Sequence, residues 1–267
     1  MKRSGFLPLA ALLAACQLQP RTLKVCADPN NMPFSNSRGD GFENKIAELV
    51  AADLHRRISY FWWPQWRGYV RKTLNAGQCD MWPGVASQLE MLATTRPYYR
   101  STYVFVTRKD RNLNLTSFDD PRLKQLRIGV QMIGNDSTNT PPTIALARRG
   151  VTRNVRGFMV YGDYDRPDRG APIVQAVANG DVDVGVVWGP LAGYFASTSK
   201  VPLTLTPVHP WLDGPDLPMV FDISMGVRKS DAKLKREIDL ILSREQPRIR
   251  AILARYGVPA PPPEAQG

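Results

Sequence analysis

Histidine is scarce in this chain of 267 residues, and several catalytic motifs are missing. His55 and His209 are the only two histidines, and neither sits in a metal-ligand spacing. The sequence has no G-x-S-x-G elbow, no G-x-G-x-x-G turn and no phosphate-binding loop. We therefore expect a protein that is not an enzyme and that has no metal site and no cofactor.

Long apolar runs and acidic residues are also in short supply. No stretch reaches the roughly 20 apolar residues of a membrane span. Lys and Arg number 35 against 24 Asp and Glu, a formal net charge of +11. No basic run is long enough to form a nucleic-acid arm, so we expect no nucleic-acid partner. A diffuse positive field favours solubility or contact with an acidic protein.

The N-terminus is typical of an export signal. Lys2 and Arg3 precede a short apolar core and a small-residue cleavage site, which predicts a signal peptide over residues 1–15. The segment 13–16, Leu-Ala-Ala-Cys, also resembles a lipobox, in which Cys16 becomes a lipid-modified first residue. Ordinary cleavage is the alternative. Either route predicts a periplasmic protein. If Cys16 is lipidated, we expect the lipid to anchor the protein to the membrane.

Export decides how the three cysteines are interpreted. With Cys16 lipidated or removed, Cys26 and Cys79 remain as an even pair in an oxidising compartment. Adjacent parallel strands would bring them together, and closing such a loop stabilises by roughly 3–5 kcal/mol on the chain-entropy model. We expect a disulfide between them, with two buried free thiols as the alternative.

Helical and strand periods alternate along the chain, which predicts an α/β protein. Residues 23–100 fit a βαβαβ unit. Its first helix is "GFENKIAELVAADL", whose amphipathic spacing puts Phe42, Ile46, Leu49, Val50 and Leu54 on one face. In the same unit "ISYFWW" is a strand and "WRGYVRKTLNAG" a helix that ends at Gly77. A second unit includes the helix "APIVQAVANG", with Pro172 in its first turn and Gly180 beyond its end. Two extended segments, "STYVFVTRKD" and "VFDISMGV", cross between the units.

These elements predict two lobes joined by a hinge of two crossing strands, with two mixed sheets flanked by helices. Lobe 1 is expected over residues 22–106 and 219–258, lobe 2 over 107–218, and a disordered tail over 259–267. A ligand bound between such lobes stabilises the closed form. The stretch "LKVCADPNNMPFSN", residues 23–36, fits the cleft, because its strand ends in a polar, proline-bounded loop at the sheet edge.

The order of elements over about residues 22–258 resembles the type 2 periplasmic solute-binding proteins. Five stretches more narrowly resemble its quinoprotein dehydrogenase-associated, MoxJ/XoxJ-like branch: "VCADPNNMPFSN", "GFENKIAELVAADL", "TTRPYYRSTYVFV", "IGVQMIGNDSTNTPP" and "VVWGPLAGYF". The resemblance implies a non-catalytic periplasmic protein that assists assembly or activation of a dehydrogenase dependent on pyrroloquinoline quinone (PQQ), such as a methanol dehydrogenase. The expected partner is a subunit of that dehydrogenase.

The resemblance also bears on the ligand. Amino-acid-binding relatives hold the ligand carboxylate with an Arg and its amino group with an Asp. The comparable positions here fall near Gln88 and at Trp188. A bidentate Arg and an anionic partner are what a zwitterion requires, so we expect that free amino acids do not bind.

The expected cleft is aromatic and apolar, which suits an apolar molecule or a peptide segment. For any one aromatic residue, packing in the core is the alternative. The turn at 134–142 offers an anion site at a helix N-terminus through Gly134 and Ser137, or a plain helix cap through Asp136 or Ser137. The expected cleft residues are Asp28, Asn30, Phe34, Trp66, Val85, Gln88, Tyr98, Ile133, Asn135, Ser137 and Trp188.

Two other functions stay open. One is the solute-binding component of an ABC transporter, with a permease as partner and a small apolar or weakly polar compound as ligand. The other is a cleft enzyme of the dehydratase kind that uses Glu90 or Asp136, although nothing in the spacing of these residues supports it.

Overall fold

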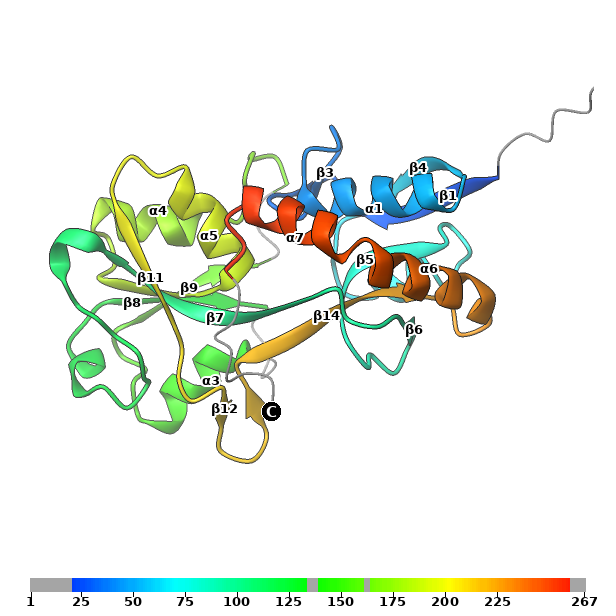
Figure 1. The fold of residues 1–267 in the computed structure, drawn as a ribbon. Coiled ribbons are helices and arrows are strands. Elements are labelled where there is room, and N and C mark those ends of the chain that lie inside the picture. The colour runs from blue at the N-terminus through cyan, green and yellow to red at the C-terminus, as the bar shows by residue number, and fades with distance from the viewer. Residues whose placement is uncertain (1–20, 134–138, 161–163, 260–267) are drawn as a thin grey trace, which may run out of the picture.

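The computed structural model describes residues 21–133, 139–160 and 164–259. The expected signal peptide, Cys16, the anion-site residues Gly134, Asp136 and Ser137, Asn135 and the tail from residue 260 lie outside the described residues. The described chain forms two lobes side by side, connected by two long strands (Figure 1). This arrangement confirms the expected mixed α/β fold.

Lobe 1 contains most of the first hundred residues and the last two helices. Its elements are β1 (Thr22–Ala27), β2 (Asn30–Asn31), β3 (Ser35–Asn36), α1 (Phe42–Asp53), β4 (Arg57–Trp62), α2 (Tyr69–Lys72), β5 (Met81–Ala86), β6 (Ala93–Thr94), α6 (Ala232–Arg244) and α7 (Gln246–Arg255). Its core forms where one face of α1 meets β1, β5 and the two C-terminal helices. Phe42, Ile46 and Val50 are fully buried there, as the helical spacing predicts.

Lobe 2 contains the middle of the chain. Its elements are the 3₁₀ turns η1 (Lys109–Arg111) and η2 (Pro121–Lys124), with β8 (Ile128–Met132), α3 (Pro141–Arg148), β9 (Val155–Met159), α4 (Pro172–Asn179), β10 (Val184–Trp188), α5 (Gly189–Ser197), β11 (Leu203–Pro207), β12 (Leu212–Asp213) and β13 (Leu217–Pro218). Helix α4 starts at Pro172 and ends at Asn179, directly before Gly180, which has a φ of +78°. Both ends agree with the sequence prediction.

The strands β7 (Tyr99–Arg108) and β14 (Val220–Val227) connect the lobes. Residues Tyr99–Thr102 of β7 pair antiparallel with β14, and the rest of β7 pairs with β10 and β11 of lobe 2. One continuous ladder results, in the order β4-β1-β5-β14-β7-β10-β8-β9, with three parallel strands at each end. The two halves of this ladder form the sheets of the two lobes.

The helix expected over "WRGYVRKTLNAG" is much shorter in the structure. Helix α2 has only four residues, Tyr69–Lys72. Gly68 precedes it with a left-handed φ of +79°, and Thr73 leaves helical geometry directly after it. The buried Thr73 hydroxyl donates to the Tyr69 carbonyl at 2.7 Å, which satisfies the last turn without extending it.

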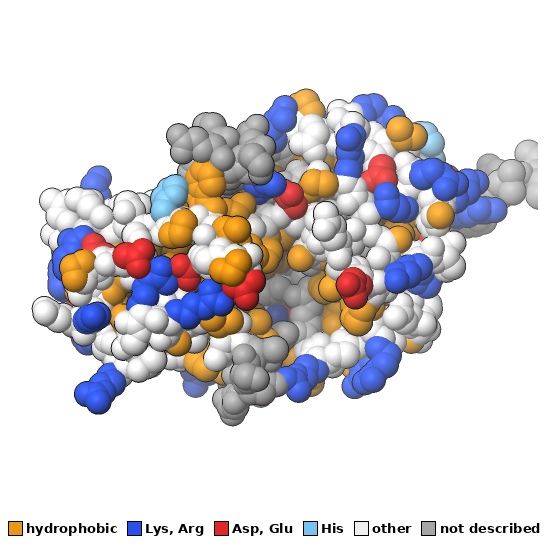
Figure 2. Space-filling model, turned by 90° about the horizontal axis from the view of Figure 1, so that it is seen from below, with side chains coloured by type: hydrophobic (Ala, Val, Ile, Leu, Met, Phe, Trp, Pro, Cys, Tyr) orange, Lys and Arg blue, Asp and Glu red, His pale blue; other side chains and the backbone are white. Residues whose placement is uncertain are grey.

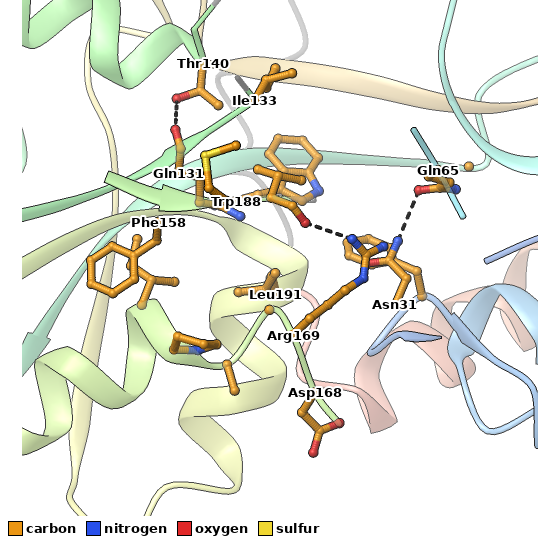
Figure 3. A pocket seen from close by; sticks show the side chains of 18 of the residues that line it. Asn31, Gln65, Gln131, Ile133, Thr140, Phe158, Asp168, Arg169, Trp188 and Leu191 are labelled. Atoms are coloured by element: carbon orange, nitrogen blue, oxygen red, sulfur yellow. Dashed lines mark hydrogen bonds between the residues drawn. The ribbon is translucent and has the colours of Figure 1, made fainter. Parts of the chain in front are cut away.

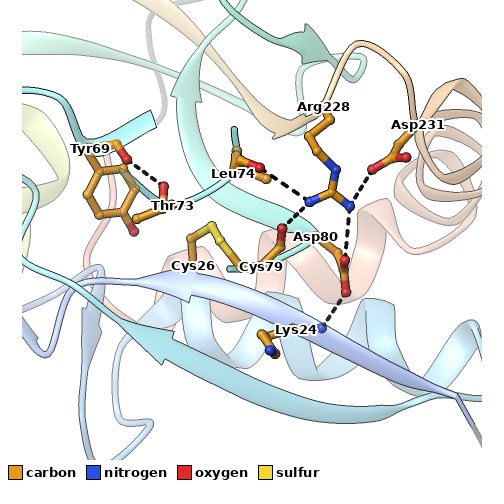
Figure 4. The surroundings of a disulfide bond; sticks show 9 residues. All are labelled: Lys24, Cys26, Tyr69, Thr73, Leu74, Cys79, Asp80, Arg228 and Asp231. Atoms are coloured by element: carbon orange, nitrogen blue, oxygen red, sulfur yellow. Dashed lines mark hydrogen bonds and ion pairs between the residues drawn. A yellow bond between two sulfur atoms is a disulfide. The ribbon is translucent and has the colours of Figure 1, made fainter. Parts of the chain in front are cut away.

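A disulfide connects Cys26 at the end of β1 to Cys79 just before β5, as the cysteine count predicts (Figure 4). Both residues are buried, at 0% and 1% exposure. Arg228, at the end of β14, also holds the Cys79 segment, because its guanidinium contacts the Asp80 carboxylate at 3.1 Å and that of Asp231 at 2.7 Å. The bridge therefore anchors the strand that leads directly into the cleft.

Candidate functional site

A cavity of about 760 Å³ lies between the two lobes (Figure 3). Its walls come from the β2–β3 loop, α1 and β5 of lobe 1, the two crossing strands, and β8, β9, α4 and α5 of lobe 2. This volume is in the range of small-molecule sites. One face of the molecule is hollowed between the lobes, with hydrophobic side chains along the lobe 2 side (Figure 2).

Three aromatic rings form one wall of this cavity, and we call them the aromatic wall: Tyr103, Trp188 and Phe221. The Trp188 ring meets Tyr103 edge-on at 5.3 Å and Phe221 edge-on at 5.9 Å between centroids. Trp188 is held at the end of β10 because its backbone N–H donates to Gln131 Oε1 at 2.7 Å. The three rings give this part of the cavity lining an apolar surface, and the faces of aromatic rings are electron-rich.

A buried ion pair connects the lobes beside the cavity. Arg169 Nη2 of lobe 2 contacts Asp28 Oδ2 of lobe 1 at 2.7 Å, and the two side chains are 2% and 0% exposed. Arg169 also donates to the carbonyls of Asn30 across the junction and Val160 within its own lobe. Tyr164 adds a hydroxyl hydrogen bond to Asp28 Oδ2, and the guanidinium lies 4.5 Å from its ring centroid.

We call this group, Asp28, Asn30, Tyr164 and Arg169, the cross-lobe latch. The Asn30 amide strengthens it by donating to the Arg166 carbonyl at 2.7 Å. Asp28 accepts two more hydrogen bonds, from the backbone N–H groups of Asn30 and Gln65, both at 2.8 Å. A buried charge is tolerated when it is paired and its remaining acceptor sites are filled, and both conditions hold here.

Glu43 brings a second buried carboxyl to the cavity. It is the second residue of α1, lines the cavity and is 4% exposed. Burial, with a smaller contribution from the Asp28 charge, raises the pKa of Glu43 to about 8. No group of the described chain forms a hydrogen bond to this carboxyl.

The residues expected in the cleft fall into four groups. Phe34, Ile133 and Trp188 line the cavity. Asp28 and Asn30 belong to the latch, and Trp66 lies next to it, edge-on to Tyr164 at 5.4 Å. Val85 and Tyr98 are buried in the packing of lobe 1, and Gln88 lies in a turn outside the cavity lining. Asn135 and Ser137 lie outside the described residues.

Sequence reasoning missed Glu43, Arg169 and Tyr164. The sequence places Glu43 in an amphipathic helix and gives it no role in the site. Its position directly after the apolar Phe42 at the helix start was a signal that its side chain lies near the core. Arg169 lies in "YDRPDRGAP", residues 164–172, which carries no periodic pattern. Nothing local in that loop indicates that its arginine reaches a strand end 141 residues away.

The described residues contain no group of three or more His, Cys, Asp or Glu side chains that could hold a metal ion. None of their helices is both long enough and apolar enough to cross a membrane.

Comparisons with known proteins agree with this geometry. Residues 23–258 match the family of bacterial extracellular solute-binding proteins, family 3. Protein MoxJ of Methylorubrum extorquens is 36% identical over 253 residues, which cover 90% of this chain and 82% of MoxJ.

Two solved structures are similar in fold. The periplasmic binding protein XoxJ from Methylobacterium extorquens AM1 is 38% identical, with a TM-score of 0.72 over 90% of this chain and 99% of XoxJ. MxaJ from Methlophaga aminisulfidivorans MPT is 27% identical, with a TM-score of 0.74 over 89% of this chain and 99% of MxaJ.

Proposed function

This chain belongs to the bacterial extracellular solute-binding proteins, family 3, and on that basis we propose that it is a non-catalytic periplasmic protein that assists assembly or activation of a PQQ-dependent alcohol dehydrogenase. The similarity to MoxJ and XoxJ extends over nearly the whole mature chain, which supports this assignment. The export signal expected in residues 1–15 supports the periplasmic location, with or without a lipid on Cys16.

The observation that carries the proposal is the Asp28–Arg169 ion pair. In a transport receptor, a ligand bound between the lobes favours closure, and the closed form then reports the cargo. Here the chain's own groups bridge the lobes through a buried contact of 2.7 Å. Closure then depends less on a cargo, and the closed pair of lobes is a pre-arranged surface for a partner protein.

Charge complementarity fits the same partner. The mature chain keeps a formal charge of +9 after loss of Lys2 and Arg3 from the total of +11. Such a chain is attracted to an acidic dehydrogenase subunit, and this steering is screened over about 8 Å at physiological ionic strength. The complex should therefore weaken as salt is raised.

A deletion strain tests the proposal. Loss of the gene should lower PQQ-dependent alcohol dehydrogenase activity in cell extracts, and the wild-type gene supplied in trans should restore it. A pull-down at low salt should recover a dehydrogenase subunit, and this recovery should fall at high salt.

The second candidate is a solute-binding component of an ABC transporter. The observation that favours it is the cavity of about 760 Å³, a volume typical of small-molecule sites. Full dehydrogenase activity in the deletion strain, with a pull-down that recovers only a permease, would establish this candidate and refute the first.

A further inference from the structure

Glu43 is a buried carboxyl that finds no hydrogen-bond partner among the described residues. It lines the cavity on the lobe 1 side at 4% exposure. The sequence makes room for it with a glycine in β5, because a Cβ on Gly84 would lie 2.0 Å from Glu43 Oε1. Burying a carboxyl with no partner is unfavourable, so such a group in a cavity wall indicates a missing ligand.

The groups around Glu43 contribute no positive charge to it. Asp28, at the end of β1, adds negative charge that disfavours ionisation of Glu43. Tyr69 of α2, Tyr98 just before β7 and Tyr99 of β7 also face it. Burial is the chief cause that raises their pKa values, and the Glu43 charge adds to it, after the Asp28 charge in the case of Tyr69.

The buried arginine of the latch is already committed, because Arg169 is bonded to Asp28 at 2.7 Å. Asp28 and Glu43 would together carry two negative charges, and the latch supplies one positive charge. Arg166 and Asp168 also line the cavity, and their opposite charges cancel in this sum. One more positive charge therefore balances Asp28, Glu43 and Arg169, and a proton on Glu43 or a cationic ligand can supply it.

We propose that Glu43 binds the ammonium group of an organic amine, whose apolar body lies against the aromatic wall in the same cavity. This inference goes beyond the proposed function and does not depend on it. Ammonium groups favour both a carboxylate and the faces of aromatic rings, and the cavity provides the two together.

The same geometry disfavours other ligand classes. An amino acid would also bring a carboxylate, but Arg169 is bonded to Asp28, and Arg166, which also lines the cavity, has a partner as well. A neutral alcohol could accept a hydrogen bond from protonated Glu43, but it would supply no charge to replace the proton. The amine is the class that satisfies both the charge balance and the apolar wall.

Binding exchanges one cation for another. The amine enters as R–NH₃⁺, the Glu43 carboxyl loses its proton to the solvent, and the carboxylate pairs with the ammonium. With a pKa of about 8 for Glu43 before binding, the ionised fraction is about 1/101 at pH 6 and about 1/2 at pH 8. Affinity should therefore rise about fiftyfold between pH 6 and pH 8.

Titration calorimetry of the mature protein tests this. The probes are a panel of primary amines from methylamine to benzylamine, with benzyl alcohol as the neutral match and phenylalanine as the zwitterion. We expect at least one amine to bind with the fiftyfold pH dependence. At pH 7 it should release about 0.9 proton, seen as a dependence of the heat on the buffer's ionisation enthalpy.

Two variants of helix α1 distinguish amine binding at Glu43 from a general effect of negative charge on the protein. Glu43→Gln keeps the shape of the side chain and should abolish the proton release and reduce amine affinity at least tenfold at pH 8. Glu48→Gln removes an exposed carboxylate of α1 and should change neither. The melting temperature of each variant shows whether it is folded.

Three results would overturn the inference. The first is that no amine in the panel binds. The second is that benzyl alcohol binds as tightly as benzylamine without a pH dependence. The third is that folded Glu43→Gln binds amines as well as the wild type does.

Discussion

Breaking the cross-lobe latch should open the lobes before it unfolds either of them. The variant is Arg169→Met, which keeps much of the apolar stem and removes the charge. In the wild type, Arg169 contacts Asp28 at 2.7 Å across the junction, and both side chains are buried. After the substitution, Asp28 loses its only charged partner among the described residues.

The size of the effect follows from the burial of the pair. Removing one partner of a buried ion pair costs about 3–5 kcal/mol, because the other charge stays buried without compensation. Opening the lobes relieves this cost by exposing Asp28 to water. The closed state should therefore lose about two to nearly four orders of magnitude in population relative to the open state, at 1.4 kcal/mol for each factor of ten.

Small-angle X-ray scattering and Trp66 fluorescence measure this opening. The radius of gyration should rise in Arg169→Met and return toward the wild-type value in Asp28→Asn/Arg169→Met, which has no buried charge left at the latch. Trp66 meets Tyr164 edge-on across the junction, at 5.4 Å between centroids, so its emission should shift when the lobes part.

A matched control comes from an ion pair within one lobe. Arg149 contacts Asp213 at 2.7 Å, and both residues belong to lobe 2. Arg149→Met should lower the melting temperature and leave the radius of gyration unchanged. If Arg169→Met behaves in the same way, losing stability without any change in scattering, the latch is ordinary lobe packing and the reasoning fails.

Three more predictions follow from the described contacts. Replacing Cys26 and Cys79 by Ser should lower the free energy of unfolding by roughly 4 kcal/mol on the chain-entropy model for a sequence separation of 53, as measured by urea denaturation under oxidising conditions. Burial raises the pKa of Glu43 from 4.5 to about 8, so the folded state holds this proton more tightly and stability falls as pH rises between these values. Glu43→Gln has no such proton to lose. Its free energy of unfolding should therefore fall less than that of the wild type as pH rises to 8, and the difference should reach up to several kcal/mol. Free amino acids should change neither the melting temperature nor Trp188 fluorescence; micromolar binding of any of them, lost in Trp188→Ala, would contradict this.

The sequence predicted those parts of the fold that depend on local periodicity. The apolar spacing of α1 predicted its buried face, and Pro172 and Gly180 predicted both ends of α4. Local patterns work there because a helix must bury one stripe and satisfy its ends within a few residues. The disulfide was predictable for another reason, since Cys26 and Cys79 are the pair that remains if Cys16 is lipidated or removed, as the expected export signal implies.

The site was harder to predict because it is made of contacts between distant segments. Asp28 and Arg169 are 141 positions apart, and each lies in a loop without periodic pattern. The aromatic residues showed a different problem, because sequence alone does not separate a cavity wall from a core. Trp188 lines the cavity, whereas Tyr98 donates its hydroxyl to the Pro83 carbonyl inside the packing of lobe 1.

The C-terminal helix has a consequence for handling this protein. Helix α7 belongs to lobe 1, but the residues after it reach lobe 2, where the Tyr256 ring stacks on Tyr194 of α5 at 6.1 Å between centroids. Gly257 and Gly193 touch so closely that a Cβ on Gly193 would lie 1.8 Å from the Gly257 carbonyl oxygen. A purification tag or fusion partner added after residue 267 begins only eight residues beyond Pro259, which also lies against α5. A bulky fusion joined directly after Pro259 would thus add mass at the seam between the lobes and bias any measurement of their opening, whereas a tag joined directly before Thr22 is attached to β1, at the outer side of lobe 1.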